Sequence, residues 1–235
     1  EGVGKPHKIV LLSVDSVIQK IVPIKEILKN SFSLKINQNV ILSNLIEWLE
    51  KMGYSRQTNV YSIGEYALRG GILDIFVPEI KYPIRLDFFG AKIEKIRTFD
   101  PSSQRSNGSI KNVSIFPVSE IILDEEAINT FRQNYRRTIG TVKTDDRVYN
   151  SISEKILVEG IEHWLPLFNP KLVPIFSFLK GASLSYDSDL QVMIENKWEQ
   201  IVESRNFDLK NVSKNPNKLS LLEASSHYLS PLEFT

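Results

Sequence analysis

Hydrophobic and polar positions alternate along the middle of the chain, between residues 59 and 100. A period of two is the pattern of β-strands with one buried face, whereas a helix repeats every 3.6 residues. The pattern predicts strands at 60–63, 66–69, 72–77, 84–89 and 92–99. Gly70-Gly71 and Gly90-Ala91 each separate two of these strands, and such two-residue links suit tight hairpin turns. We therefore predict a small domain built on short antiparallel strands.

Helical spacing precedes and follows this block of strands. Apolar residues between 39 and 52 recur at helical intervals, and Gly53 suits the position just after a helix. The residues that define a second predicted helix are Asp124 as its N-cap, Ile128, Phe131 and Tyr135 as its buried stripe, and Gly140 as its end. The middle of the chain thus combines helices with antiparallel strands.

The remaining segments predict an α/β fold. Residues 8–14 are continuously apolar, which is typical of a buried strand, and Asp15 or Ser16 is placed to cap a short helix after it. A strand followed by a helix is the repeating unit of α/β proteins. The other predictions are a loop at 101–112, strands at 173–178 and 183–186, a helix from Asp187 or Asp189 to about residue 204, and a final helix at 219–229.

The strand at 84–89 has an unusual second face. Its alternation places Ile84, Leu86 and Phe88 on one face and Arg85, Asp87 and Phe89 on the other. The first face is an ordinary core face, and the second puts an aromatic ring among charges. Arg85 and Phe89 lie about 13 Å apart along that face, and Arg69, at the end of a neighbouring strand, is placed to join them.

Two interpretations of this second face remain open from alternation alone. Arginine and aromatic side chains often dominate the binding energy of protein interfaces, which favours a docking surface. In the other interpretation, Phe89 covers its own domain and the arginines are solvated. Asp74 and Asp87 are placed to form a carboxylate pair on neighbouring strands, but charge pairing of Asp87 with Arg85 explains Asp87 without catalysis.

Composition excludes several classes of chemistry. The chain has 235 residues, and its 42% hydrophobic and 24% charged content is ordinary for a folded protein. It has no cysteine, and its three histidines are far apart, so we expect no thiolate site and no metal site. Gly4-Lys5 lacks the rest of a phosphate-binding loop. We therefore expect no catalysis by this chain.

Charge also argues against binding of a polyanion. Lys and Arg total 29 against 28 acidic residues, and residues 64–104 hold six basic and six acidic residues. Arg132, Arg136 and Arg137 cluster on a predicted helix, where they suit the negative end of its dipole. No apolar run is long enough to cross a membrane. The lack of an initiator Met and of a signal peptide leads us to expect a fragment of a longer cytoplasmic protein.

Three sequence blocks resemble a known family. EYALRGGILDIFVP is followed by YPIRLDFFGAKIEKIRTFDPSSQRS, and the elements RGGILDIF, RLDFFG and FDPxSQRS occur together and in order. These blocks resemble the UvrB-homology module of the bacterial transcription-repair coupling factors (the Mfd family). The resemblance extends to LLSVDSVIQKIVP before them and to GIEHWLPLF after them, so it covers nearly the whole chain.

The resemblance implies a fold and a partner. It implies a degenerate, helicase-like (P-loop NTPase-like) α/β domain at residues 1–30 and 117–235, interrupted by an inserted, antiparallel α+β UvrA-binding domain at 31–116. It implies that Arg69, Arg85 and Phe89 contact the excision-repair protein UvrA. The fragment is expected to be monomeric and to bind no cofactor.

The resemblance also implies functions of the parent protein. RNA polymerase and double-stranded DNA would be partners of the parent, and ATP and Mg would serve its separate translocase motor. A UvrB-type repair protein is the main alternative, because UvrB shares the docking module, but the FDPxSQRS ending favours the coupling factor. A nucleic-acid-binding module is a further alternative.

Overall fold

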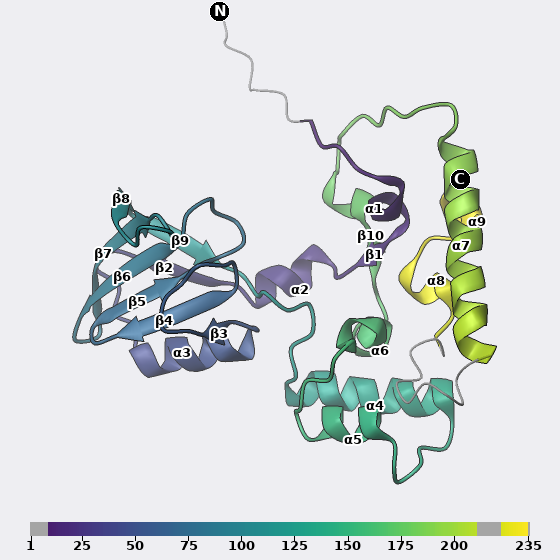
Figure 1. Cartoon of the computed structure of the whole chain (residues 1–235), viewed down its shortest axis with the longest axis horizontal. Helices are drawn as coiled ribbons and strands as arrows, with labels where there is room; N and C mark the ends of the chain where they lie inside the picture. Colours follow the sequence, from purple (N-terminus) through teal and green to yellow (C-terminus); the bar gives the residue numbers. More distant parts are fainter. Residues whose placement is uncertain (1–8, 211–221, 235) are drawn as a thin grey trace, which may run out of the picture. The chain divides into compact units, whose positions relative to one another are not determined.

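The computed structural model describes residues 9–210 and 222–234, which form two compact units (Figure 1). One unit comprises Ile24–Asn129, and the other comprises Glu1–Pro23 with Thr130–Thr235. The elements of the first unit are α2 (Ile24–Lys29), β2 (Phe32–Lys35), α3 (Leu42–Lys51), β3 (Ser55–Arg56), β4 (Glu65–Arg69), β5 (Ile72–Ile75), β6 (Ile84–Phe89), β7 (Lys92–Phe99), β8 (Ser106–Ile110) and β9 (Asn112–Ile115).

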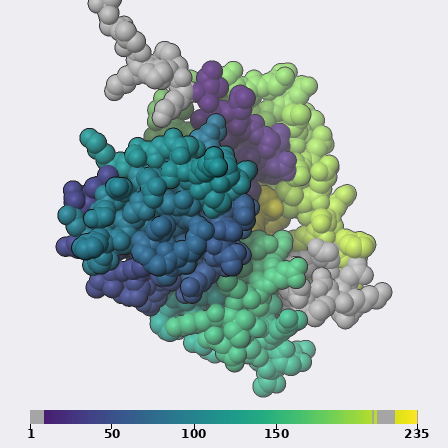
Figure 2. Space-filling model, turned by 60° about the vertical axis from the view of Figure 1, so that its left-hand side comes forward, coloured from purple at the N-terminus to yellow at the C-terminus, as the bar shows by residue number. Residues whose placement is uncertain are grey.

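A six-stranded sheet in the order β3-β4-β5-β6-β7-β8 forms the centre of the first unit (Figure 1). All its pairings are antiparallel except the short parallel pair of β3 and β4. Strands β2 and β9 form a separate antiparallel pair. The predicted mixed α/β class with antiparallel strands is therefore confirmed. In the space-filling view the blue and teal residues of this unit form one continuous body of atoms (Figure 2).

Both predicted hairpin turns are confirmed. Arg69 lies opposite Ile72 and Phe89 lies opposite Lys92, so each turn has two residues. Gly70 and Gly90 have φ angles of 58° and 60°. A positive φ at the first central position suits a type II′ turn, in which glycine avoids the steric cost that a Cβ would bring. Glycine thus sets where these strands reverse.

One face of the sheet packs on α3. Leu68, Leu73, Leu86 and Ile96 lie opposite one another in a row across four strands. The helix contributes Leu45 and Leu49 to the same core, and Met52, directly after the helix, is buried there as well. Gly53 follows with a φ of 90°, as predicted for the residue after the helix. This face is the one that the alternation of Ile84, Leu86 and Phe88 predicted.

A β-bulge adjusts the register of β7. Asp87 lies opposite Lys95 and Phe88 lies opposite Ile93, so Glu94 is an extra residue in its strand. Ile93 and Ile96 are both buried although they are three positions apart. The extra residue lets both isoleucines face the core, which strict alternation along β7 would forbid.

The other face of the sheet has a smaller apolar cluster. Val60, Ala67, Phe76 and Phe99 are buried together there. Val60 comes from the loop before β4, where a strand at 60–63 was predicted, and that prediction is wrong. The Glu65 carboxylate accepts hydrogen bonds from the backbone N–H groups of Tyr61 and Ser62, at 2.7 and 2.9 Å. These bonds hold the loop in a turn that has no strand partner.

Two further predictions are wrong because composition concealed the local structure. The polar segment predicted as a loop at 101–112 contains β8, which pairs with β7 through its backbone. Of the apolar segment 8–14, the described residues 9–13 form no strand, and Ile9 and Leu11 are 84% and 90% exposed. Lys8 lies outside the described residues. Backbone pairing and tertiary partners, which composition does not report, decided both cases.

The second unit is mainly helical. Its elements are α1 (Val14–Ile18), β1 (Lys20–Ile21), the end of α4 (Glu125–Ile139), α5 (Arg147–Ser153), the 3-10 helix η1 (Ile161–Trp164), α6 (Leu165–Phe168), β10 (Val173–Pro174), the 3-10 helix η2 (Ile175–Phe178), α7 (Leu190–Lys210), α8 (Ala224–His227) and α9 (Pro231–Phe234). Strands β1 and β10 pair antiparallel. Val17 and Ile18 of α1 pack with Ile194 of α7 and with Leu229.

Helix α4 agrees with its prediction. The Asp124 carboxylate accepts a hydrogen bond from the backbone N–H of Ala127 at 2.9 Å, as an N-cap does. Ile128, Phe131 and Tyr135 are buried, and Gly140 follows the helix with a φ of 86°. The rings of Phe131 and Tyr135 lie 5.2 Å apart in an aromatic cluster.

The later predictions agree less well. Only Val173–Pro174 of the segment 173–178 is strand, and the exposed residues 183–186 form none. Helix α7 begins after Asp189 as predicted but runs six residues further than residue 204. The predicted final helix at 219–229 lies partly outside the described residues, and its described part contains only the short α8. No helix among the described residues is long and apolar enough to cross a membrane.

The α3 face of the sheet gives a direct test of the core. We expect Leu49→Ala to lower the free energy of unfolding by about 2–5 kcal/mol, because the substitution leaves a cavity under the sheet. The matched control is Ile41→Ala, whose side chain is 61% exposed and should change that free energy by less than about 0.5 kcal/mol. Urea unfolding followed by circular dichroism measures both. Equal losses would contradict the assigned core face.

Candidate protein-docking site

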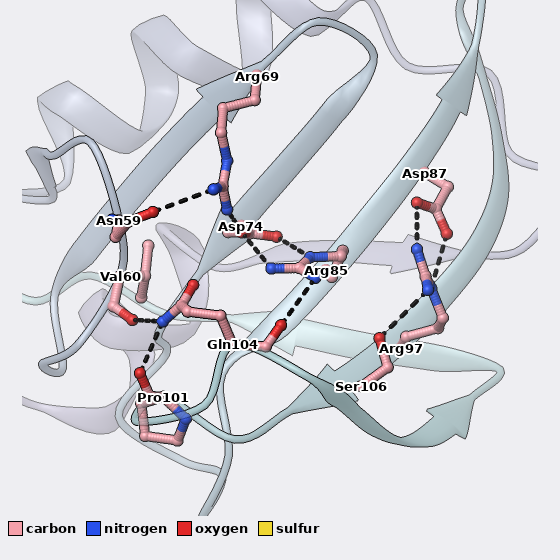
Figure 3. A network of polar contacts seen from close by, with 10 residues as sticks. All are labelled: Asn59, Val60, Arg69, Asp74, Arg85, Asp87, Arg97, Pro101, Gln104 and Ser106. Atoms are coloured by element: carbon pink, nitrogen blue, oxygen red, sulfur yellow. Dashed lines mark hydrogen bonds and ion pairs between the residues drawn. The ribbon is translucent and has the colours of Figure 1, made fainter.

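A buried carboxylate lies at the centre of the polar face of the sheet (Figure 3). Asp74 of β5 has no exposed surface. It lies directly opposite Arg85 of β6 in the antiparallel register. Its two oxygens accept hydrogen bonds from two arginines, Arg69 and Arg85. A buried carboxylate is costly unless it is paired and hydrogen-bonded, and these two arginines satisfy that requirement.

Arg85 forms the more extensive of the two contacts. Its Nε donates to Oδ1 of Asp74 at 2.7 Å and its Nη2 donates to Oδ2 at 2.8 Å. Its Nη1 donates to the backbone carbonyl of Gln104 at 3.2 Å, and its guanidinium lies 4.5 Å from the centre of the Phe99 ring. The hydrogen bonds to Asp74 raise the pKa of Arg85 above its usual value. Only 14% of its side chain is exposed.

Arg69 approaches the same carboxylate from the end of β4. Its Nη2 donates to Oδ2 of Asp74 at 2.7 Å, and its Nη1 donates to Oδ1 of Asn59 at 3.0 Å. Its side chain remains 47% exposed. The two arginines therefore share one carboxylate but differ in accessibility, since Arg69 faces solvent and Arg85 is largely covered.

A tight turn after β7 supports Arg85. Asp100 accepts hydrogen bonds from the backbone N–H and hydroxyl of Ser103, which lower the pKa of Asp100. Gln104 has a φ of 59°, and its Nε2 donates to the carbonyls of Val60 at 3.0 Å and Pro101 at 2.7 Å. Its own carbonyl then faces Arg85. These contacts explain the acidic and amide positions of the FDPxSQRS block.

The charge pairing predicted for Asp87 is different in the structure. Asp87 does not pair with Arg85 but accepts hydrogen bonds from Arg97 Nε at 2.9 Å and Nη2 at 2.7 Å. Arg97 also donates to the Ser106 hydroxyl at 3.2 Å. The physical reason is the register, because Asp74 lies opposite Arg85 and is closer to it than a residue two positions along the same strand. Asp74 and Asp87 therefore form two separate ion pairs.

Phe89 is the exposed aromatic side chain of this region. It is the last residue of β6 before the hairpin turn and is 76% exposed. The turns at Gly70-Gly71 and Gly90-Ala91 lie at the same end of the sheet, since the N–H of Phe88 donates to the carbonyl of Gly71 at 2.8 Å. Arg69 and Phe89 each border one of these turns. We call the two turns with Arg69 and Phe89 the hairpin end.

The hairpin end has the composition of a docking surface. A large exposed ring at the same end of the sheet as a partly exposed arginine suits protein binding better than solvation, because both side chains can bury much area against a partner. The interpretation in which Phe89 covers its own domain does not fit a ring with three quarters of its surface exposed. Within residues 9–210 and 222–234, no group of three His, Asp or Glu residues is placed to hold a metal ion.

Three residues of this network were not predicted as site residues from the sequence. They are Asp74, Asn59 and Gln104. The two-residue turn at Gly70-Gly71 determines that Ala67 lies opposite Asp74. The sequence could therefore have predicted on which face of the sheet the Asp74 side chain lies. Its alignment with Arg85 was not, because eight residues separate β5 from β6. Of the histidines considered in the sequence, His163 lies in η1 of the other unit and is not part of this network, and His7 lies outside the described residues.

Comparison of the sequence with known proteins shows which proteins this chain resembles. Residues 32–121 match the family model described as the UvrB interaction domain. The chain is 34% identical over 182 residues to the transcription-repair-coupling factor of Haemophilus influenzae, which covers 77% of this chain and 16% of that protein. It is 31% identical over 189 residues to that of Escherichia coli, which covers 80% and 16%. The chain thus spans about a sixth of the length of these relatives.

The buried carboxylate predicts a difference in stability between two arginine variants. We expect Arg85→Ala to lower the free energy of unfolding by about 3 kcal/mol, because Asp74 stays buried and loses two of the three hydrogen bonds that its side chain accepts from the arginines. Arg97→Ala is the matched control, since its partner Asp87 is partly exposed and the expected loss is about 1 kcal/mol. Thermal and urea unfolding measure both variants. A larger loss for Arg97→Ala would contradict the central role of Asp74.

Proposed function

From the UvrB interaction domain at residues 32–121 and the homology of the chain to transcription-repair-coupling factors, we propose that this chain is the UvrA-recruiting segment of such a factor. In the parent protein this segment would bring the nucleotide excision repair protein UvrA to RNA polymerase stalled at DNA lesions. The observation that carries the proposal is Phe89, a large ring left exposed at the hairpin end of the matching domain.

The residues proposed to serve UvrA binding are Arg69, Arg85 and Phe89, of which Arg69 and Phe89 are exposed enough for direct contact. Phe89 would fill an apolar recess on UvrA, and Arg69 would form charge-assisted hydrogen bonds with an acidic group beside it. Exposure supports a direct role for these two residues, which are accessible at the same end of the sheet. Arg85 belongs to the same network through Asp74.

The residues outside the hairpin end are proposed to support it structurally and to divide into two domains. We assign residues 31–116 to the inserted UvrA-binding domain and residues 1–30 with 117–235 to a split, degenerate, motor-like α/β domain. The similarity to coupling factors supports this division, because it covers 77–80% of the chain and thus extends beyond residues 32–121. The separate unit formed by Glu1–Pro23 and Thr130–Thr235 supports it as well.

The proposal assigns no reaction to this chain. ATP hydrolysis with Mg, translocation on double-stranded DNA and polymerase binding would belong to the parent protein. The relatives named above are coupling factors, which favours this reading over a UvrB-type repair protein. The site of action would be the bacterial cytoplasm, where transcription and excision repair take place.

Calorimetry with purified UvrA tests the role of Phe89. We expect Phe89→Ala to weaken binding by at least about tenfold, equivalent to roughly 1.4 kcal/mol, because the ring would lose its buried contact. Tyr186→Ala is the control, since Tyr186 is 66% exposed and lies outside the matching domain. Its affinity should equal that of the unaltered chain. An unchanged affinity for Phe89→Ala would refute the assigned contact.

A salt titration tests the nature of the partner. We expect the unaltered chain to give no measurable signal with duplex DNA at about 50 mM salt, because its 29 basic and 28 acidic residues are nearly balanced. Fluorescence anisotropy with a labelled duplex measures this. Tight binding that falls steeply with salt would favour a nucleic-acid-binding module instead.

A further inference from the structure

We infer that Asp74 is a positioning residue for UvrA binding, which fixes Arg69 at the hairpin end, and that Arg85 serves binding by holding Asp74 and not by touching UvrA. This inference rests on the proposed function and assigns a separate role in binding to each residue of the network. Arg69 and Phe89 contact the partner, whereas Asp74 and Arg85 determine where Arg69 points.

Accessibility separates the two roles. Asp74 has no exposed surface, so it cannot contact a partner that leaves the sheet intact. Arg85 has 14% of its side chain exposed, and the Phe99 ring lies against its guanidinium. Three of its five N–H groups donate to Asp74 and Gln104. Two N–H groups of Arg85 remain, but they belong to a side chain that is only 14% exposed, so UvrA could reach little of it without breaking these charge-assisted bonds.

The hydrogen bonds form a closed ring that includes Arg69 (Figure 3). Arg69 donates hydrogen bonds to Asp74 and to Asn59, and Asn59 is linked covalently to Val60. The Val60 carbonyl accepts a hydrogen bond from the side chain of Gln104. The Gln104 carbonyl accepts one from Arg85, which donates to Asp74 and so closes the ring. Arg69 is therefore held at two points, Asp74 and Asn59. Both points are connected to Arg85 on the far side of the ring.

Holding Arg69 in advance has a physical consequence for binding. A free arginine side chain has many rotamers, and association must immobilise it at a cost in entropy. A guanidinium already held by two partners has lost much of that freedom before UvrA arrives. Its hydrogen bonds to Asp74 and Asn59 use two of its five N–H groups and leave three for a partner.

The charges of the network favour an acidic partner group. Two guanidiniums share one carboxylate, so Arg69, Arg85 and Asp74 together have a net charge of +1 (two positive charges and one negative). The neighbouring pair of Asp87 and Arg97 has no net charge. The positive charge is presented through Arg69, the more exposed of the two arginines. A carboxylate on UvrA is the expected group opposite it.

A double-mutant cycle tests the inference in the whole chain, with UvrA affinity measured by calorimetry. We expect Asp74→Asn to weaken binding about fivefold or more when Arg69 is present and less than about twofold in an Arg69→Ala background, because Asp74 acts through Arg69. Asp87→Asn is the matched control, since it alters the adjacent ion pair on the same face. It should change binding less than about twofold in both backgrounds.

The outcomes separate this inference from the proposed function. Unaltered binding by Asp74→Asn, or an equal loss with and without Arg69, would overturn the inference and leave UvrA binding itself in place. A chain that does not bind UvrA at all would overturn both. The folded fraction of each variant, measured by circular dichroism, corrects the affinities for any unfolding.

A second variant keeps the test decisive if Asp74→Asn unfolds the domain. Asn59→Ala removes the other hydrogen bond to Arg69 from a loop and leaves the buried carboxylate paired. We expect it to weaken UvrA binding about two- to fivefold only when Arg69 is present. The same loss in the Arg69→Ala background would show that Asn59 acts independently of Arg69 and would overturn the inference.

Discussion

The architecture of the polar face depends on one carboxylate buried between two guanidiniums. Asp74 has no exposed surface, so its charge must be balanced inside the sheet, and Arg85 balances it from the next strand with two hydrogen bonds. A buried ion pair of this kind gives little net stability, because desolvation offsets much of the attraction. Its value is geometric, since it determines where the side chains around it point.

That constraint links the core of the domain to its exposed end. The row Leu68, Leu73, Leu86 and Ile96 fixes the register of four strands against α3, and the same register places Asp74 opposite Arg85. The carboxylate then holds Arg69 beside the turn at Gly70-Gly71. Packing on one face of the sheet thereby determines the position of a charged group on the other face, at the same end of the sheet as Phe89.

Much of this arrangement follows from local sequence rules. Alternation identified Ile84 and Leu86 as core residues, and the pairs Gly70-Gly71 and Gly90-Ala91 identified both hairpin turns. Local rules could not identify what depends on tertiary partners. The apolar residues 9–13 form no strand, whereas the polar segment β8 is a strand because its backbone pairs with the edge of β7. The partner of Arg85 was missed for the same reason, since the link between β5 and β6 is too long to determine their register.

The most direct test of the central claim is hydrogen exchange of this chain with and without UvrA. We predict that UvrA slows exchange of the backbone N–H groups in the two turns of the hairpin end, at Gly70-Gly71 and Gly90-Ala91. Exchange in α7 of the other unit should not change. Protection confined to the second unit, or no protection anywhere, would contradict the claim that this chain docks on UvrA through the hairpin end.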